Sequence, residues 1–159
     1  MKIPGGIRSG LVLLAYAFVL ATVQATVTGS LSFRSAAPDL ALVLAVLAGY
    51  RYGSREGALA GLAAGFFRDY YTGQVLGVGM LSLMYMGLLA SVLFHRWLRK
   101  NLLVELLQVA LLTLVFQAGL HLLLFLFPPL AGVPFTGDDL LLALRLRILP
   151  SVLLNLAAA

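Results

Sequence analysis

Residues 57–77 read GALAGLAAGFFRDYYTGQVLG, and this stretch decides how the rest of the chain is interpreted. Gly57, Gly61 and Gly65 recur every four residues. Because an α-helix turns once in 3.6 residues, the three glycines lie on one face. A face without side chains lets another helix approach to backbone contact, as small-xxx-small motifs do in membrane proteins. The stretch therefore predicts a closely packed membrane helix over about residues 55–70.

The second half of this stretch predicts where that helix ends. Residues 66–71 are aromatic and charged, which is typical of the point where a helix leaves the lipid. Residues 72–74 then predict a short polar turn, and Leu76 and Gly77 open a new apolar run. The order is a membrane helix, a turn and the start of the next helix.

The composition of the whole chain places it in the membrane class. Hydrophobic residues make up 62% of its 159 residues, charged residues make up 11%, and the mean hydropathy is +1.02. A soluble domain of this size could not cover such a surface with polar groups. Six spans of about 20 residues need about 120 residues, which leaves too few for a soluble catalytic domain. The sequence has no cysteine, which excludes disulfides and thiolate metal sites.

Apolar runs bounded by turns or charges predict six transmembrane helices in a single all-α membrane domain. Their approximate ranges are 11–28, 38–50, 55–70, 75–94, 102–127 and 139–159. The first run resembles a signal peptide, but the polytopic remainder favours an uncleaved helix. The second is only about 20 Å long at 1.5 Å per residue, so interfacial residues or bilayer thinning must make up the difference.

The distribution of basic residues predicts the topology. Alternate loops place seven on one side: Lys2, Arg8, Arg51, Arg55, Arg96, Arg99 and Lys100. The other side has four: Arg34, Arg68, Arg145 and Arg147. The positive-inside rule then puts both termini in the cytoplasm, N-in/C-in. It also explains the net charge of +5 without a nucleic-acid partner. The basic segment 95–100, which includes Trp97, is either a site for anionic membrane lipid or an ordinary stop signal.

Small residues also line the first two predicted helices. Ala17, Ala21 and Ala25 form a four-residue ladder, which could receive a partner helix or pack within the bundle. The second helix continues the pattern with Ala37, Ala41, Ala45 and Gly49. We expect it to form a close antiparallel hairpin with the glycine face of the third helix.

Charged residues at membrane depth are functional candidates by default. Here they are Asp39, Asp69, Arg145 and Arg147, all toward the outer side. Arg147 is the deepest, and we predict that it pairs with Asp39 or Asp69, because an unpaired guanidinium there is costly. The alternative is that each charge reaches the interface separately.

A search for catalytic motifs finds none. HExxH and GxxxxGK[ST] are absent from the sequence, and no Ser nucleophile lies near a base. His121 is interpreted as a hydrogen-bonding residue inside the bundle or, alternatively, as part of a proton relay. The sequence therefore predicts a protein that is not an enzyme and needs no cofactor or metal.

The motifs of the central region resemble the family of the bacterial rod-shape-determining protein MreD. The pattern is a Pro-Asp start to the second helix, a GxxxG helix that runs into an Asp, a short turn and Leu-Gly. The residues that carry it are Pro38, Asp39, Gly61, Gly65, Asp69, Leu76 and Gly77. Leu149, Pro150, Ser151 and Asn155 also resemble the last helix of that family.

The resemblance implies a non-enzymatic, multi-pass subunit of the elongasome in the bacterial inner membrane. Such a protein binds the single-span protein MreC, and through it links the MreB filament to RodA and its penicillin-binding transpeptidase during peptidoglycan elongation. The sequence leaves open which helices contact the partner. A symmetric homodimer through the same glycine faces also stays open.

The family is also similar in fold to the substrate-binding subunits of energy-coupling-factor vitamin transporters, which gives an alternative function. The ladder Ala17, Ala21 and Ala25 fits those subunits, and the outer charged residues would then line a solute pocket. The short, weakly polar outer loops favour the scaffold over this alternative.

Overall fold

The computed structural model describes residues 7–31, 38–72, 77–95, 101–126 and 148–159. Within these ranges every regular element is a helix, which confirms the all-α class. The α-helices are α1 (Ile7–Leu31), α2 (Leu40–Tyr52), α3 (Ser54–Thr72), α4 (Val78–Ala90), α5 (Leu102–Leu126) and α8 (Leu149–Ala158). The α4 helix continues directly into a π-helix, η1 (Ser91–His95), which the sequence did not predict.

The observed bounds follow the predicted ranges, with differences at the ends. α1 begins at Ile7 rather than near residue 11, and α4 begins at Val78 rather than near residue 75. Of the predicted range 139–159, the described part is Ile148 onward, with Pro150 in the first turn of α8, where a missing N–H is tolerated. Leu76 and Arg147 lie outside the described residues.

Among the described residues, the stretch Leu102–Leu122 of α5 is the one that is both long and apolar enough to cross a membrane. Shorter apolar helices cover Leu11–Gln24, Leu40–Tyr52, Val78–Leu93 and Leu149–Ala158. These findings fit a membrane protein. The six-span arrangement and the N-in/C-in topology stay predictions.

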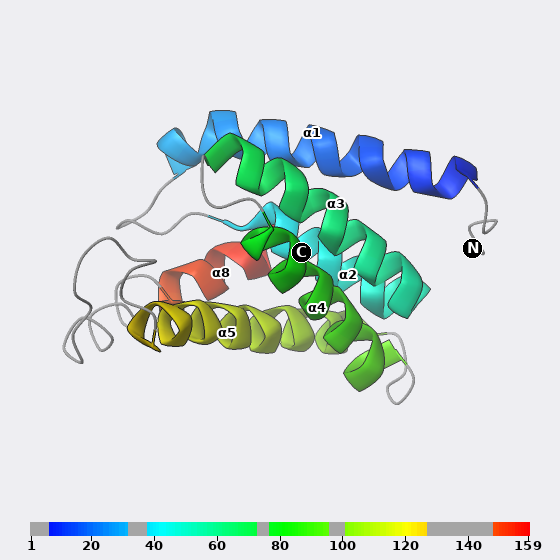
Figure 1. The fold of residues 1–159 in the computed structure, drawn as a ribbon. Coiled ribbons are helices and arrows are strands. Elements are labelled where there is room, and N and C mark those ends of the chain that lie inside the picture. Colours follow the sequence, from blue (N-terminus) through cyan, green and yellow to red (C-terminus); the bar gives the residue numbers. More distant parts are fainter. Residues whose placement is uncertain (1–6, 32–37, 73–76, 96–100, 127–147) are drawn as a thin grey trace.

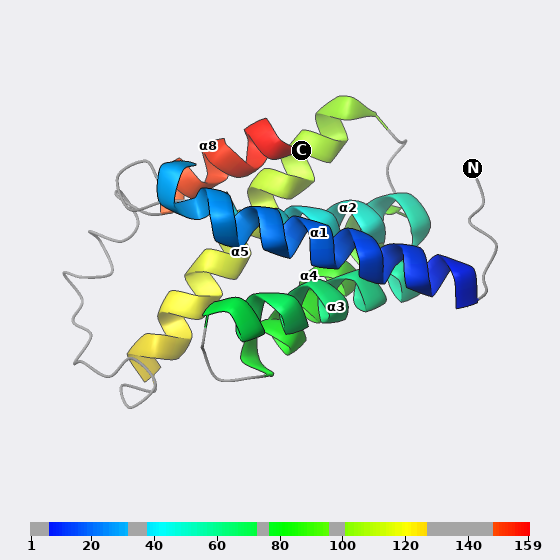
Figure 2. The ribbon, with the colours of Figure 1, turned by 90° about the horizontal axis from the view of Figure 1, so that it is seen from above.

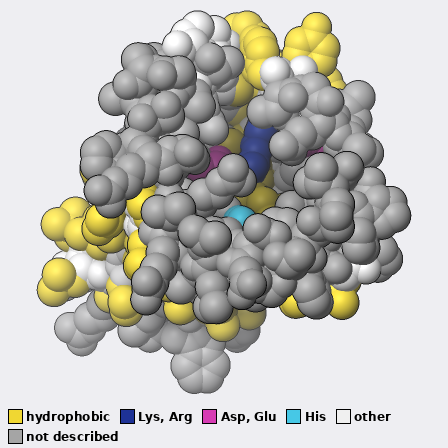
Figure 3. Space-filling model, turned by 90° about the vertical axis from the view of Figure 1, so that its left-hand side faces the viewer, with side chains coloured by type: hydrophobic (Ala, Val, Ile, Leu, Met, Phe, Trp, Pro, Cys, Tyr) yellow, Lys and Arg dark blue, Asp and Glu magenta, His cyan; other side chains and the backbone are white. Residues whose placement is uncertain are grey.

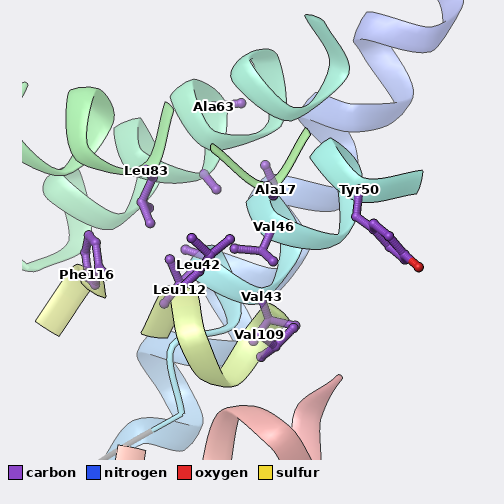
Figure 4. Packing of buried hydrophobic residues seen from close by; sticks show 13 residues of the cluster. Ala17, Leu42, Val43, Val46, Tyr50, Ala63, Leu83, Val109, Leu112 and Phe116 are labelled. Carbon is purple, nitrogen blue, oxygen red and sulfur yellow. The ribbon is translucent and has the colours of Figure 1, made fainter. Parts of the chain in front are cut away.

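The α2 helix is the centre of the fold, because it contacts all the other described helices (Figures 1 and 2). Its small and β-branched side chains allow this, since neighbours on several sides can come close. The buried residues of α2 are Ala41, Leu42, Val43, Ala45, Val46, Ala48, Gly49 and Tyr50. Figure 4 shows Leu42 of α2 beside Leu112 of α5, and Val46 of α2 and Leu83 of α4 belong to the same buried cluster.

Gly53 makes the turn between α2 and α3. Its φ of 113° lies in the left-handed region that a side chain disfavours, and its N–H bonds to the carbonyl of Gly49 at 3.1 Å. The two helices pack against each other directly after this turn, as the sequence predicted.

The glycine face of α3 packs mainly on α4, so the prediction that it faces α2 is wrong for most of its length. A Cβ on Gly61 would overlap the backbone of Leu83, and one on Gly65 would lie 2.5 Å from the Cα of Met80. Only at the Gly53 end does α2 share the contact, where a Cβ on Gly57 would lie 2.5 Å from the Cα of Gly49. The α4 helix also contacts α2, so it packs against both helices of the hairpin.

The α4 helix also presents glycines toward α3. The sequence analysis missed them because they are not spaced four residues apart. Gly79 and Gly87 are eight residues apart, close to two helical turns, and both lie toward α3. The carbonyl of Gly87 lies beside Gly49 and Gly57, so three helices meet there at backbone distance. This backbone contact is shared by α2, α3 and α4.

Candidate functional site

A buried polar network surrounds the start of α2, and Asp39 is its centre. The Asp39 Oδ1 atom accepts the N–H of Leu42 at 3.1 Å and so caps the helix, while Oδ2 lies 2.9 Å from an Arg68 guanidinium nitrogen. Arg68 also lies over the ring of Phe116 in α5, 5.2 Å from its centroid. Asp39 therefore joins α2 to α3, and Arg68 extends the connection to α5.

Asn155 of α8 completes this network from the other side. Its Oδ1 atom accepts the backbone N–H of Asp39 at 2.6 Å, and its Nδ2 atom donates to Thr113 Oγ1 of α5 at 3.1 Å. Gln24 of α1 accepts the N–H of Ala41 at 3.4 Å. Side chains of this chain thus accept the N–H groups of Asp39, Ala41 and Leu42 at the start of α2, where an N–H has no partner within the helix.

Asp69 accepts N–H groups at the start of α4, as Asp39 does at the start of α2. Its Oδ2 atom accepts the N–H groups of Gly77 and Gly79, both at 3.0 Å, and of Met80 at 3.3 Å. A carboxylate at this position is favoured by the positive end of the helix dipole. The other carboxylate oxygen lies so close to the Cα of Gly79 that a Cβ there would overlap it. Asp69 is buried, so the carboxylate is part of the α3–α4 contact.

Within the described residues, Asp39 and Asp69 have partners that the sequence analysis did not assign to them. Asp39 pairs with Arg68, which the sequence analysis had assigned to a membrane border, and Asp69 caps α4. Because Arg147 lies outside the described residues, its pairing stays a prediction.

The polar network around Asp39 lies at some distance from the C-terminal ends of α1 and α5. From Gln24, α1 continues to Leu31, about 10 Å at 1.5 Å per residue, and from Phe116, α5 continues to Leu126, about 15 Å. Figure 3 shows this face, with a basic side chain between acidic ones in a hollow and a histidine below them. His121 is 7% exposed, and its Nδ1 atom lies 2.7 Å from the carbonyl of Gln117.

A second polar contact ties the other end of α2 to α5. Arg51 donates from Nε and from a terminal nitrogen to the two carboxylate oxygens of Glu105, each at 2.8 Å. The Tyr50 hydroxyl accepts the N–H of Asn101 just before α5 at 3.3 Å. Sequence reasoning missed this pair because the residues are far apart in the chain and no local spacing links them.

The small-residue ladders lie inside the bundle. Ala17 is 1% and Ala21 is 6% exposed, and the three glycines of α3 are buried. The side chain of Ala25 is outside the described residues. These faces serve helix packing in this structure, and a partner-binding role for them stays a prediction.

An apolar groove runs instead along the outer surface of α1 and α3. Its volume is about 270 Å³. It is lined by Leu13, Leu14, Leu59, Leu62, Ala63, Phe66 and Met80. Edge-to-face packing of the Phe18 and Phe67 rings, with centroids 5.3 Å apart, holds α1 on α3 beside it. Nothing in the sequence pattern had indicated this groove.

The chemistry of the described residues favours binding and packing. No group of three His, Cys, Asp or Glu side chains among them is close enough to hold a metal ion. The buried polar groups around Asp39 and Asp69 are engaged in caps and interhelical bonds, whereas the buried amide of Gln108 in α5 has no hydrogen-bond partner. The arrangement can therefore fix helices relative to one another.

Comparison with known families decides the class. The model of the family described as rod shape-determining protein MreD matches residues 7–137. This chain belongs to the MreD family. Its role is therefore in the machinery that determines cell shape, as a membrane-associated shape protein. No curated protein and no solved structure matches the chain.

The MreD match covers α1 to α5, and α8 lies beyond it. Most residues on which the resemblance to MreD rests have a structural role in the described part of the chain. Asp39 caps α2, Asp69 caps α4, and Gly61 and Gly65 allow the α3–α4 contact. Pro38 lies directly before the cap, and Gly77, with φ 108°, begins α4. Nothing in the comparisons supports the vitamin-transporter alternative.

Proposed function

We propose that this chain is a non-enzymatic, multi-pass scaffold of the bacterial inner membrane that binds the single-span protein MreC. Membership in the MreD family supports a place in a shape-determining complex. In this proposal, six helices cross the membrane with both termini inside. Through MreC the chain is linked to MreB, RodA and the penicillin-binding transpeptidase.

The N-termini of α2 and α4 are bonded by side chains of this chain, which favours a scaffold over a solute carrier. Helix N-termini within a membrane protein are ready sites for anionic ligands, because their N–H groups point outward. Here Asp39, Asn155 and Gln24 accept N–H groups at the start of α2, and Asp69 accepts N–H groups at the start of α4. The chain itself supplies the groups that a bound solute would otherwise provide.

The observation that carries the proposal is the apolar groove along α1 and α3. Its lining side chains Leu14, Leu59 and Leu62 are 47%, 46% and 39% exposed, so a partner helix could still cover them. Helices associate in membranes mainly through close packing, since each interhelical hydrogen bond contributes only about 0.6 kcal/mol. A groove without polar groups suits the apolar span of MreC.

Co-purification of MreC from membranes with paired variants tests this surface. Leu62→Gln places an amide in the groove, and Leu111→Gln is its control, because Leu111 is similarly exposed at 44% but lies on α5. An unpaired amide costs about 1–3 kcal/mol, so we expect MreC recovery to fall roughly tenfold for Leu62→Gln alone. Equal recovery with both variants would remove the groove from the proposal, and no recovery with the unmodified chain would remove MreC binding.

A further inference from the structure

The apolar groove along α1 and α3 has a basic residue at the end nearest the start of α3. Along α3, the groove lining begins at Leu59 and reaches Phe66. Arg55 lies four residues before Leu59, close to one helical turn, so both residues lie on the same face of α3. At a rise of 1.5 Å per residue, the groove begins about 6 Å from Arg55 and extends to about 16 Å from it. This surface is therefore apolar along its length and cationic at one end.

The Arg55 side chain is available to a ligand. It is exposed, and it makes no ion pair with the part of the chain that the structure describes. Arg51 lies at the same end of α3 but is bonded to Glu105. Glu56 follows Arg55 in the sequence, yet successive residues of a helix point about 100° apart, so Glu56 lies off the groove face. The positive charge at this end of the groove is thus carried by Arg55.

The groove itself accepts only apolar groups. Its volume is about 270 Å³, and all its lining side chains are apolar. At the end far from Arg55, the Phe66 ring packs edge-to-face on Phe67, with centroids 5.5 Å apart, and Phe67 packs in the same way on Phe18 of α1. A ligand that fits this surface has an apolar chain and a negative charge at one end.

We propose that the groove holds an acyl chain of an anionic phospholipid, whose headgroup binds Arg55. A guanidinium binds phosphate oxygens through paired, charge-assisted hydrogen bonds. On the predicted N-in/C-in topology, Arg55 lies at the cytoplasmic surface, where anionic lipids attract basic residues. The inference rests on the proposed multi-pass arrangement but not on the binding of MreC. Because MreC is proposed to use the same groove, the lipid occupies it in the free chain and leaves when MreC binds.

Native mass spectrometry of the full-length chain in detergent micelles, without MreC, tests this site. The probes are phosphatidylglycerol and phosphatidylcholine with identical acyl chains, so that they differ in net charge. We expect phosphatidylglycerol to bind the unmodified chain about fivefold more tightly, since one basic residue at the membrane surface contributes about that factor. In the Arg55→Gln chain, phosphatidylglycerol should bind only as well as phosphatidylcholine does.

A second pair of variants tests the groove independently of charge. Leu59→Trp fills the groove and should weaken the binding of both lipids, whereas Leu111→Trp on α5 should weaken neither. Leu59 and Leu111 are 46% and 44% exposed, so the two changes are matched.

Three results would overturn the proposal. Equal binding of the two lipids to the unmodified chain, which requires no variant to fold, would mean ordinary contact with the bilayer. Selectivity that survives Arg55→Gln would place the headgroup elsewhere, and equal effects of the two tryptophan variants would place the acyl chain elsewhere. None of these measurements contains MreC, so their failure is distinguishable from a failure of the proposed function.

Discussion

At the scale of single residues, the fold depends on where side chains are missing as much as on where they are present. The α3 glycines lie against the α4 backbone, and Gly79 leaves room for the Asp69 carboxylate. Each of these positions has a backbone or carboxylate neighbour that cannot move aside easily. The glycines of this chain are therefore not equivalent, and their surroundings predict which of them tolerate a methyl group.

Replacing Gly61 by Ala should destabilise the protein, whereas the same change at Gly119 should not. A Cβ at Gly61 overlaps the backbone of Leu83, so α3 and α4 must separate, which costs about 1–3 kcal/mol. A Cβ at Gly119 meets no described atom within 4 Å, and Ala favours the helix by up to about 1 kcal/mol. Thermal unfolding of both variants in the same detergent measures the difference. A Gly61→Ala protein as stable as Gly119→Ala would contradict the α3–α4 contact.

Asp69→Ala should destabilise the start of α4 more than Asp69→Asn does. The alanine variant leaves the N–H groups of Gly77, Gly79 and Met80 without an acceptor, at a cost of about 1–3 kcal/mol. The asparagine variant keeps a carbonyl oxygen as acceptor but loses the favourable charge at the helix dipole. Amide hydrogen exchange at Gly79 and Met80 reports the effect locally. Protection that is unchanged in the alanine variant would show that Asp69 is not the cap.

At the scale of helices, the sequence predicted where the helices lie along the chain better than it predicted which residues pack against one another. Hydropathy and the Pro-Asp motif located α2, and the prediction of an acidic N-terminus is confirmed by the Asp39 cap. The partner of Asp39 could not be predicted in this way, because Asn155 is 116 residues away and no local periodicity relates them. The π-helix after α4 also left no sign, since a single wider turn does not change composition.

The ion pair between Arg51 and Glu105 should stabilise the packing of α2 against α5. Glu105 is 8% exposed at its side chain and Arg51 is 54% exposed, so solvent screens part of the attraction. We expect Arg51→Ala to cost about 1–2 kcal/mol, mainly because Glu105 is left without its bidentate partner. Arg55→Ala is the control, since Arg55 is exposed on the neighbouring α3. Chemical unfolding of both variants measures the cost, and equal midpoints would exclude a structural role for the pair.

At the scale of the whole molecule, polar groups gather at the two ends of the α2–α3 hairpin. Asp39, Arg68 and Asp69 lie at one end, and Arg51 and Glu105 lie at the other. The apolar groove and the buried glycine contacts lie between them. The positive-inside rule assigns these two ends to opposite sides of the membrane, with the Arg51 end in the cytoplasm. This assignment therefore gives the predicted topology a direct test.

Single cysteines at the two ends of α3 should be labelled from opposite sides of the membrane. The natural sequence has no cysteine, so Ser54→Cys and Tyr71→Cys each give one reactive thiol at an exposed position. The N-in/C-in arrangement puts position 54 in the cytoplasm and position 71 outside, because the basic turn Arg51–Arg55 is retained inside. A membrane-impermeant maleimide should then label Tyr71→Cys in intact spheroplasts and Ser54→Cys only in inverted vesicles. The reverse pattern would invert the topology, and labelling of both from one side would mean that α3 does not cross the membrane.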